Sequence, residues 1–372
     1  MFKRSWYVLC LFVFLLVPLS ASAAKSQELT VMTRNLYLGA DLAPVIAAKT
    51  PEEFFSAAQT VLIKVAANNF PERAQALAAE IVEKKPHLVG LQEVSNFTFN
   101  GYNAQPPFRD YLADLMAALA AQGADYRAAA VVKNLDVQVP LSGNIVGVTD
   151  RDVILARGDV VTAVVPVALS GCRQSLDGCN YTVVATATTP VGDISFERGF
   201  VAVDAVVGGM PVRFVNTHLE QSARDLDPTN PLASIFQSLQ AVELISILAG
   251  FPNPLNVPII VVGDINSSPQ DQTVTVGPYV IVPPYSRFAN AGYTDAWTLR
   301  PGDPIGFTCC QDENLLNLYS NLYERVDVTF TSELPVGMVK VNTVGNDEED
   351  KTPSGLWPSD HAGVVTRLEF AP

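Results

Sequence analysis

Short, unbroken apolar runs alternate along this chain with longer segments whose apolar residues recur at helical spacing. The strand pattern is seen in HLVGLQEV, VRFVNTHL and VPIIVVGDIN. The helical pattern is seen in PERAQALAAEIVEKK. The run PIIVVG contains no alternating polar residues, so it is predicted to lie in the middle of a sheet with both faces covered. Strands and helices mixed in this way predict an α/β fold in which helices cover the sheets.

The same patterns give the expected elements. Helices are predicted over 51–69, 71–85, 108–123 and 231–250, with Pro51 and Pro71 at helix starts and Gly123 at a helix end. Strands are predicted over 28–38, 87–94, 151–157, 159–169, 181–189, 199–207, 212–219, 257–266, 325–332 and 362–370.

Residues 1–24 are predicted to be a secretory signal peptide. Lys3 and Arg4 precede an apolar run from Trp6 to Leu19, and the small residues of SASAA follow it. The alternative is a single membrane anchor, but the run is short for a span of about 20 residues. We therefore expect cleavage after Ala23 or Ala24 and a secreted or periplasmic protein.

Residues 25–372 contain no Ser/Gly linker, charge block or internal repeat, so they are predicted to form a single domain. No segment after the leader is expected to be long and apolar enough to insert stably in a membrane. The net charge of −14 becomes −16 once Lys3 and Arg4 are removed. This acidity does not suit a protein that holds nucleic acid mainly by neutralising phosphates, although a local basic patch is compatible with it.

Two pairs of cysteines follow the leader. Cys172 and Cys179 flank a polar loop and are predicted to form a disulfide, the alternative being two free thiols. Cys309 and Cys310 are adjacent, and a bond between neighbours departs from usual disulfide geometry, so their state stays open. Zinc binding has little support, because no CxxC motif or histidine cluster accompanies them.

Polar residues stand at the ends of the predicted strands. They are Arg34 and Asn35, Gln92 and Glu93, Asn216 and His218, Asp264 and Asn266, Asp327, and Asp360 with His361. Each alone is compatible with a solvated strand end or a turn. Because strand ends on one edge of a sheet converge, their joint occurrence predicts a site there. His87, which has no acid nearby, is interpreted as structural.

These groups suit the hydrolysis of a phosphate ester. Glu93 and Asp360 offer hard oxygen ligands for Mg²⁺, with Mn²⁺ or Ca²⁺ as alternatives, and such an ion stabilises phosphate charge. Histidines can donate or accept protons, and the Asn266 amide can donate to a phosphate oxygen. The chain has neither a GxSxG motif nor a Walker-type glycine loop, which disfavours serine hydrolases and P-loop nucleotide hydrolases.

The ordered set TRNLY, LQEV, NTHLE, GDINSSP, ERVDVTF and SDHAGV resembles the endonuclease/exonuclease/phosphatase superfamily, which includes deoxyribonucleases and neutral sphingomyelinases. The resemblance runs from Asn35 to His361. It implies a four-layer α/β sandwich, in which two packed mixed sheets are flanked by helices, and a metal-dependent phosphoric ester hydrolase.

The resemblance also implies a role for each matching residue. Glu93 is similar to the main metal ligand, with Asn35 beside it, and Asp360 to a second metal-side or phosphate-side group. His361 resembles the catalytic histidine and Asp327 the acid that orients it. The other three positions are similar to the water-activating acid, a phosphate stabiliser and a second histidine: Asp264, Asn266 and His218. Whether histidine or aspartate is the base stays open.

One further acid is expected between LQEV and NTHL. Asp136 and Asp152 are the candidates, and Asp152 is favoured because it precedes a strand. The segment from Gly306 to Gln311 is expected to border the site.

The predicted partner is a phosphate ester, either nucleic acid or a phospholipid headgroup, acted on by a monomer. Basic residues near the motifs are few: Arg34, Arg151, Arg157, Arg198 and Arg325. The segments VIVPPYSRF and FPNPLNVP could contact a membrane surface, although prolines also mark turns. The alternative function is a non-catalytic binding or adhesion protein on the same fold.

Overall fold

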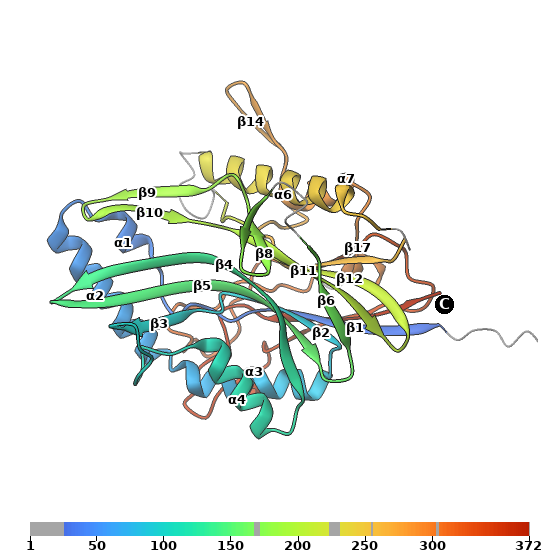
Figure 1. Cartoon of the computed structure of the whole chain (residues 1–372), viewed down its shortest axis with the longest axis horizontal. Coiled ribbons are helices and arrows are strands. Elements are labelled where there is room, and N and C mark those ends of the chain that lie inside the picture. The colour runs from blue at the N-terminus through green and yellow to red at the C-terminus, as the bar shows by residue number, and fades with distance from the viewer. Residues whose placement is uncertain (1–25, 167–171, 223–230, 254–255, 303–304, 372) are drawn as a thin grey trace, which may run out of the picture.

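Two large mixed sheets packed face to face form the centre of the molecule, with helices outside them (Figure 1). The computed structural model describes residues 26–166, 172–222, 231–253, 256–302 and 305–371. The predicted signal peptide lies outside the described residues, so its prediction stays open.

The first sheet contains both ends of the described chain. Its strand order is β18 (Lys340–Val344), β19 (Gly363–Phe370), β1 (Gln27–Asn35), β2 (Leu88–Gln92), β5 (Asn144–Arg157) and β3 (Asn96–Phe99), and β4 (Tyr126–Leu141) also pairs with β5. Strand β1 runs parallel to β2 and antiparallel to β19. Asn35 at the end of β1 is therefore in register with Gln92 at the end of β2.

The second sheet is built around β12 and β13. Its order is β16 (Thr294–Asp295), β17 (Asp327–Thr331), β13 (Ile259–Asp264), β12 (Met210–His218), β11 (Gly199–Val207), β8 (Gly178–Asn180) and β7 (Arg173–Ser175), and β6 (Val161–Val164) pairs with β11. Strand β13 is parallel to β12 and antiparallel to β17. His218 and Asp327 are thus the two register neighbours of Asp264.

Most buried apolar residues of the described chain belong to three large clusters, and a small fourth one contains Tyr37, Leu315, Leu356 and Trp357. One cluster, which includes Val31 and Val262, fills the space between the sheets. A second packs the first sheet against helices α2 (Pro51–Ala67), α3 (Phe70–Lys84) and α4 (Tyr111–Ala121). A third packs the second sheet against α6 (Leu232–Gly250) and α7 (Pro284–Asn290). The predicted four-layer α/β sandwich is confirmed.

Short elements complete the fold. They are helix α1 (Ala43–Ala47), the 3₁₀ helices η2 (Ala296–Leu299) and η3 (Glu348–Asp350), and the hairpins β9 (Ala185–Thr189) with β10 (Gly192–Phe196) and β14 (Val274–Val276) with β15 (Tyr279–Ile281). The β14–β15 hairpin projects from the α6 side of the molecule in Figure 1. The disulfide expected between Cys172 and Cys179 is present and ties β8 to the residue before β7.

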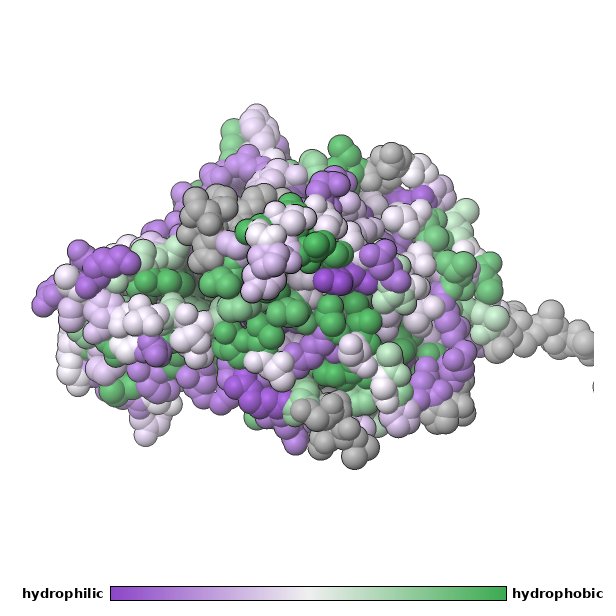
Figure 2. All heavy atoms as spheres, turned by 90° about the horizontal axis from the view of Figure 1, so that it is seen from above, coloured by the Kyte–Doolittle hydropathy of each residue, from purple (hydrophilic) through white to green (hydrophobic). Residues whose placement is uncertain are grey.

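Helix α6 corrects one expectation, because it is long and apolar enough, by length and composition alone, to cross a membrane. Its Ala241, Leu244 and Leu248 are buried in the core against the second sheet, as in the core helix of a globular domain. The face that carries α6 mixes hydrophobic and hydrophilic side chains (Figure 2).

The two sheets approach closely next to the predicted site. A Cβ atom on Gly90 of β2 would lie 2.5 Å from Val262 and 2.7 Å from the Asn216 Oδ1 atom, so only glycine fits. The Asn216 amide uses this space to donate to the carbonyl oxygens of Leu91 and Val153, while its Oδ1 accepts from Gln92 Nε2. These bonds fix the two sheets relative to each other beside the site.

Candidate active site

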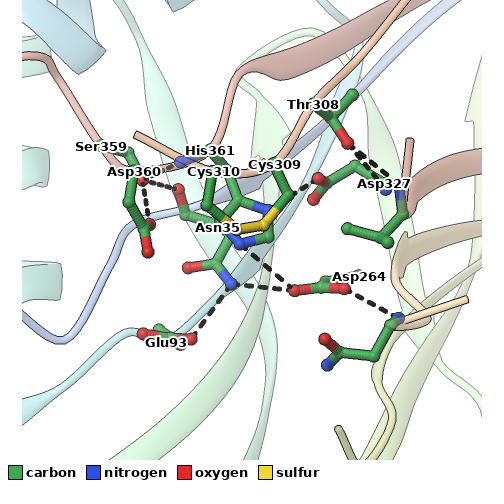
Figure 3. The surroundings of a disulfide bond; sticks show 12 residues. Asn35, Glu93, Asp264, Thr308, Cys309, Cys310, Asp327, Ser359, Asp360 and His361 are labelled. Carbon is green, nitrogen blue, oxygen red and sulfur yellow. Dashed lines mark hydrogen bonds and ion pairs between the residues drawn. A yellow bond between two sulfur atoms is a disulfide. The ribbon is translucent and has the colours of Figure 1, made fainter. Parts of the chain in front are cut away.

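The predicted site residues converge where β1, β2 and β13 end and β17 and β19 begin (Figure 3). Asn35 is the last residue of β1, and Glu93 follows β2. Asp264 is the last residue of β13, and Asp327 is the first of β17. Because both sheets contribute, residues up to 326 positions apart meet at one edge, as from Asn35 to His361.

Asn35 lies between the two sheets and touches a carboxylate of each. Its Nδ2 atom donates to Glu93 Oε1 at 3.1 Å and to Asp264 Oδ2 at 3.2 Å. Its Oδ1 atom accepts from the Tyr37 backbone N–H at 2.9 Å, and Glu93 Oε2 accepts from the Leu38 N–H at 2.6 Å. In this arrangement Asn35 orients both carboxylates.

His361 is held by Asp327. Its Nδ1 atom lies 2.8 Å from Asp327 Oδ2, and its Nε2 atom lies 3.8 Å from Asp264 Oδ2. Burial by itself lowers the pKa of His361, but the charges of Asp327, Asp360 and Asp264 outweigh it and hold the pKa well above its usual value. The Nε2 atom of His361, on the side of the ring near Asp264, is thus available to donate a hydrogen bond.

Asp264 occupies the middle of the cluster. Its Oδ2 atom lies 3.5 Å from His218 Nε2, and its Oδ1 accepts from the Asn266 backbone N–H at 2.9 Å. Burial raises its pKa to about 7, against the opposing charge of His361. The preceding Gly263 has φ of +147°, and a Cβ there would lie 1.9 Å from the Thr217 carbonyl oxygen, so glycine is required.

His218 and Asn266 form the other side of the site. The Asn266 Nδ2 atom lies 3.1 Å from His218 Nε2 and donates to the Leu219 carbonyl at 3.0 Å. Arg198 Nη1 lies 3.0 Å from His218 Nδ1. Burial, followed by the charges of Arg198 and His361, lowers the pKa of His218 well below its usual value. The pKa values of the two histidines are thus shifted in opposite directions.

Two site residues have unusual backbone conformations. Glu93 has φ of +54° and Asn266 has φ of +49°, in the left-handed region that residues other than glycine occupy uncommonly. Such conformations concentrate at functional sites, where the surrounding structure enforces them.

Asp136 and Asp152, the two candidates for a further acid at the site, differ in where the structure places them. Asp136 is exposed and pairs with Lys133 at 2.6 Å. Asp152 is buried near His218 and Asp150, and one ligand atom from each of these three lies within 4.8 Å of the others. Asp152 Oδ2 accepts from Asn134 Nδ2 at 2.8 Å. Asp152, on β5, is therefore the acid that borders the site.

Asp150 is a site neighbour that the sequence did not single out. Burial raises its pKa to about 7, and Glu93 adds to the shift. Its Oδ1 atom and that of Asp152 have no hydrogen-bond partner among the described residues. The signal was present in TDRDV, where two acids alternate with Arg151 at the approach to a buried strand.

Two buried arginines hold the loops of the site in position, a role that was not predicted from the sequence. Arg34 donates to both carboxylate oxygens of Glu80, at 3.0 and 2.9 Å, and to the His361 carbonyl oxygen. Arg73 of α3 donates to the carbonyl oxygens of Leu36, Tyr37 and Pro358. An arginine in an amphipathic helix usually faces solvent, so the burial of Arg73 could not be predicted from the helical pattern.

The segment from Gly306 to Gln311 borders the site, as expected. Cys309 makes β-bridges to His361 and to Glu324, and a disulfide joins it to Cys310. The Gln311 N–H donates to the Asp360 carbonyl at 2.7 Å. Figure 3 shows this disulfide beside His361, and one ligand atom from each of the three residues lies within 4.8 Å of the others.

The donor set suits a hard divalent cation. Burial raises the pKa of Asp360 to about 6, and among the neighbouring charges Glu93 raises it further. Asp327 Oδ1 is buried and has no partner among the described residues. Several buried carboxylates with few cations beside them would be stabilised by a bound Mg²⁺-like ion, and their oxygens are its preferred ligands. Among the described residues, one ligand atom from each of Asp264, Asp327 and His361 lies within 4.8 Å of the others.

Comparisons with known proteins support the fold. No protein-family model and no curated protein matches the sequence. Among solved structures, a Leptotrichia buccalis endonuclease/exonuclease/phosphatase family protein is 15% identical over 92% of this chain and 100% of its own, with a TM-score of 0.52. One from Beutenbergia cavernae is 20% identical, over 93% of this chain and 72% of its own, also at 0.52.

A third family protein, from Bacteroides thetaiotaomicron, is 16% identical over 93% of this chain and 99% of its own, with a TM-score of 0.51. All three carry the same family description and are matched over nearly the whole described chain. The chain therefore has the endonuclease/exonuclease/phosphatase fold.

Proposed function

We propose that this protein is a divalent-metal-dependent phosphoric ester hydrolase that acts by in-line attack of water. The observation that carries the proposal is the position of Asp264. Its Oδ2 atom is contacted by the Asn35 amide and lies within 4 Å of both His218 and His361. A buried carboxylate between two imidazoles and beside a cation-binding set is the arrangement that activates water next to a phosphate.

Each residue then has a role that follows from its position. Asp264 accepts a proton from the attacking water, and the Nε2–H of His361, oriented by Asp327, donates to a phosphate oxygen. Asn266 and His218, whose Nδ2 and Nε2 atoms lie 3.1 Å apart, would also contact the phosphate. Glu93 and Asp360, with Asn35 beside them, would hold Mg²⁺, Mn²⁺ or Ca²⁺, which when bound supplies charge stabilisation to the phosphate.

Within this class we favour a phospholipid headgroup over nucleic acid. The arginines near the motifs are engaged by carboxylates: Arg34 by Glu80, Arg151 by Asp110, Arg157 by Asp159, Arg198 by Glu220 and Arg325 by Asp295. They therefore do not form a track of free charge for a phosphate backbone.

The loop between Gln311 and Glu324 supports the same choice. It begins and ends beside Cys309 and exposes apolar side chains, among them Leu316 (55%), Leu318 (66%) and Tyr319 (66%). Apolar residues next to a phosphate site suit a substrate with an apolar part. We also propose that the protein is secreted, in keeping with the leader predicted from its sequence and with two disulfides.

A panel assay tests the proposal. The protein would be incubated with each substrate in turn, once with Mg²⁺ and once with EDTA. The substrates are vesicles of phosphatidylcholine, sphingomyelin or phosphatidylinositol, DNA, RNA and bis-p-nitrophenyl phosphate. Metal-dependent turnover of a phospholipid is the expected result. Turnover of nucleic acid alone would reverse the substrate choice. Binding without turnover of any substrate would favour the alternative, a non-catalytic binding protein on this fold.

A further inference from the structure

The Cys309–Cys310 disulfide lies where its two sulfur atoms and a nitrogen of His361 could share a ligand. One ligand atom from each of the three residues lies within 4.8 Å of the others. Cys309 and His361 are buried, and Cys310 is partly exposed. Sulfur and imidazole nitrogen are the donors preferred by thiophilic cations such as Zn²⁺, whereas the carboxylates beyond them suit Mg²⁺.

The backbone holds these three residues together independently of the disulfide. Cys309 is bridged to His361, the Ala362 N–H donates to the Thr308 carbonyl at 2.7 Å, and the Gln311 N–H donates to the Asp360 carbonyl at 2.7 Å. The segment is therefore fastened on both sides of the cysteines. Opening the disulfide would release two thiols that stay beside the imidazole.

We propose that Cys309, Cys310 and His361 form a second, redox-gated metal site that binds Zn²⁺ only when the disulfide is reduced. A dithiol reductant transfers two electrons and two protons to the disulfide, gives two thiols and itself becomes a disulfide. Zn²⁺ then binds the two thiolates and the imidazole with release of three protons, two from the thiols and one from the Nε2–H of His361. Because Nδ1 of His361 is bonded to Asp327, Nε2 supplies the third ligand. Water can complete the tetrahedron.

Occupation of this site would stop catalysis. The Nε2 atom that faces Asp264 would be bound to zinc and could no longer donate to a phosphate oxygen. The reduced, zinc-bound protein would be inactive, and oxidation would restore activity. The loss of activity on zinc binding rests on the proposed hydrolase function. The existence of the zinc site does not.

Cobalt tests the site directly, because Co²⁺ bound by thiolates absorbs in the near ultraviolet and Co²⁺ bound by carboxylates does not. The full chain would be titrated with Co²⁺ before and after reduction by a phosphine, together with C309S/C310S and, as the matched control, C172S/C179S, which lacks the other disulfide. Cys10 is common to all samples. We expect the band in the reduced wild type and in reduced C172S/C179S, and its absence from the oxidised wild type and C309S/C310S.

A band that persists in C309S/C310S, or that is equal in the oxidised and reduced wild type, would overturn the proposal. If C309S/C310S fails to fold, as judged by its melting transition, H361A decides, since the band should then weaken and change shape. Zn²⁺ should also lower turnover of the reduced wild type and of reduced C172S/C179S by at least about tenfold, but not that of C309S/C310S. If no protein shows turnover, the cobalt band still decides whether the site exists.

Discussion

The Nδ1 atom of His361 lies 2.8 Å from Oδ2 of Asp327, which joins the loop before β19 in one sheet to the start of β17 in the other. Neither residue is exposed by more than 6%. The pair fixes the ring so that its second nitrogen faces Asp264, and it can form only after both sheets have packed. The site is thus a product of the sheet-to-sheet interface.

Replacement of Asp327 by asparagine should remove the charge that orients His361 while keeping the shape of the side chain. We expect kcat to fall by roughly 10²–10⁴-fold with a smaller change in KM, because orientation matters most in the transition state. Steady-state kinetics on bis-p-nitrophenyl phosphate would measure this. The matched control is D136N, at an exposed carboxylate, and an equal loss in both variants would contradict the role given to Asp327.

Glu93 is predicted to govern the metal requirement. The E93Q variant should need a much higher Mg²⁺ concentration for half-maximal activity, because a charged oxygen ligand is replaced by a neutral one. Activity would be followed during Mg²⁺ titration after treatment with EDTA. The control is E83Q, which alters an exposed carboxylate of helix α3 and should leave the titration unchanged. An unaltered midpoint in E93Q would place the metal elsewhere.

Asp150 gives a predicted dependence of stability on pH. Burial raises its pKa from 3.8 to about 7, so the folded protein binds a proton that the unfolded chain releases between these values. The free energy of unfolding should therefore lose this contribution as pH rises from about 4 to about 7. D150N mimics the protonated group, so it should unfold at higher urea concentration than the wild type at neutral pH and at a similar one near pH 4. The opposite order would show that Asp150 is stabilised as an anion.

The buried Arg34–Glu80 ion pair should be essential for stability. Removing one partner in E80Q leaves the Arg34 charge buried without a counter-ion, which costs about 3–5 kcal/mol. The control is D159N, which removes the partner of Arg157 in an exposed pair and should cost no more than about 1 kcal/mol. Urea denaturation would measure both. Similar small losses would mean that the Arg34 network contributes little.

The sequence predicted most of the layers and the residues that line the site. Buried parallel strands such as β13 carry unbroken apolar runs, and their polar ends mark the site edge. Strand β4 was not predicted, because register shifts between Ala128 and Ala130 and between Lys133 and Leu135 interrupt the alternation of its side chains. A bulged strand breaks the period of two on which prediction depends.

The supporting contacts could not be predicted, because they join segments distant in the chain. Nothing local to Arg73 shows that its guanidinium binds carbonyl oxygens of the Leu36 and Pro358 loops. Likewise, the placement of Cys309 beside His361 depends on two backbone bridges that form only in the folded protein. Sequence patterns identify which residues carry chemistry, whereas packing decides which of them meet.

The central claim is that Asp264 activates water beside a metal-bound phosphate. Turnover of bis-p-nitrophenyl phosphate by D264N in saturating Mg²⁺ tests it most directly, with the melting transition as the check on folding. We predict that D264N folds and that its kcat is at least about 100-fold below that of the wild type. A folded D264N with wild-type turnover would contradict the account.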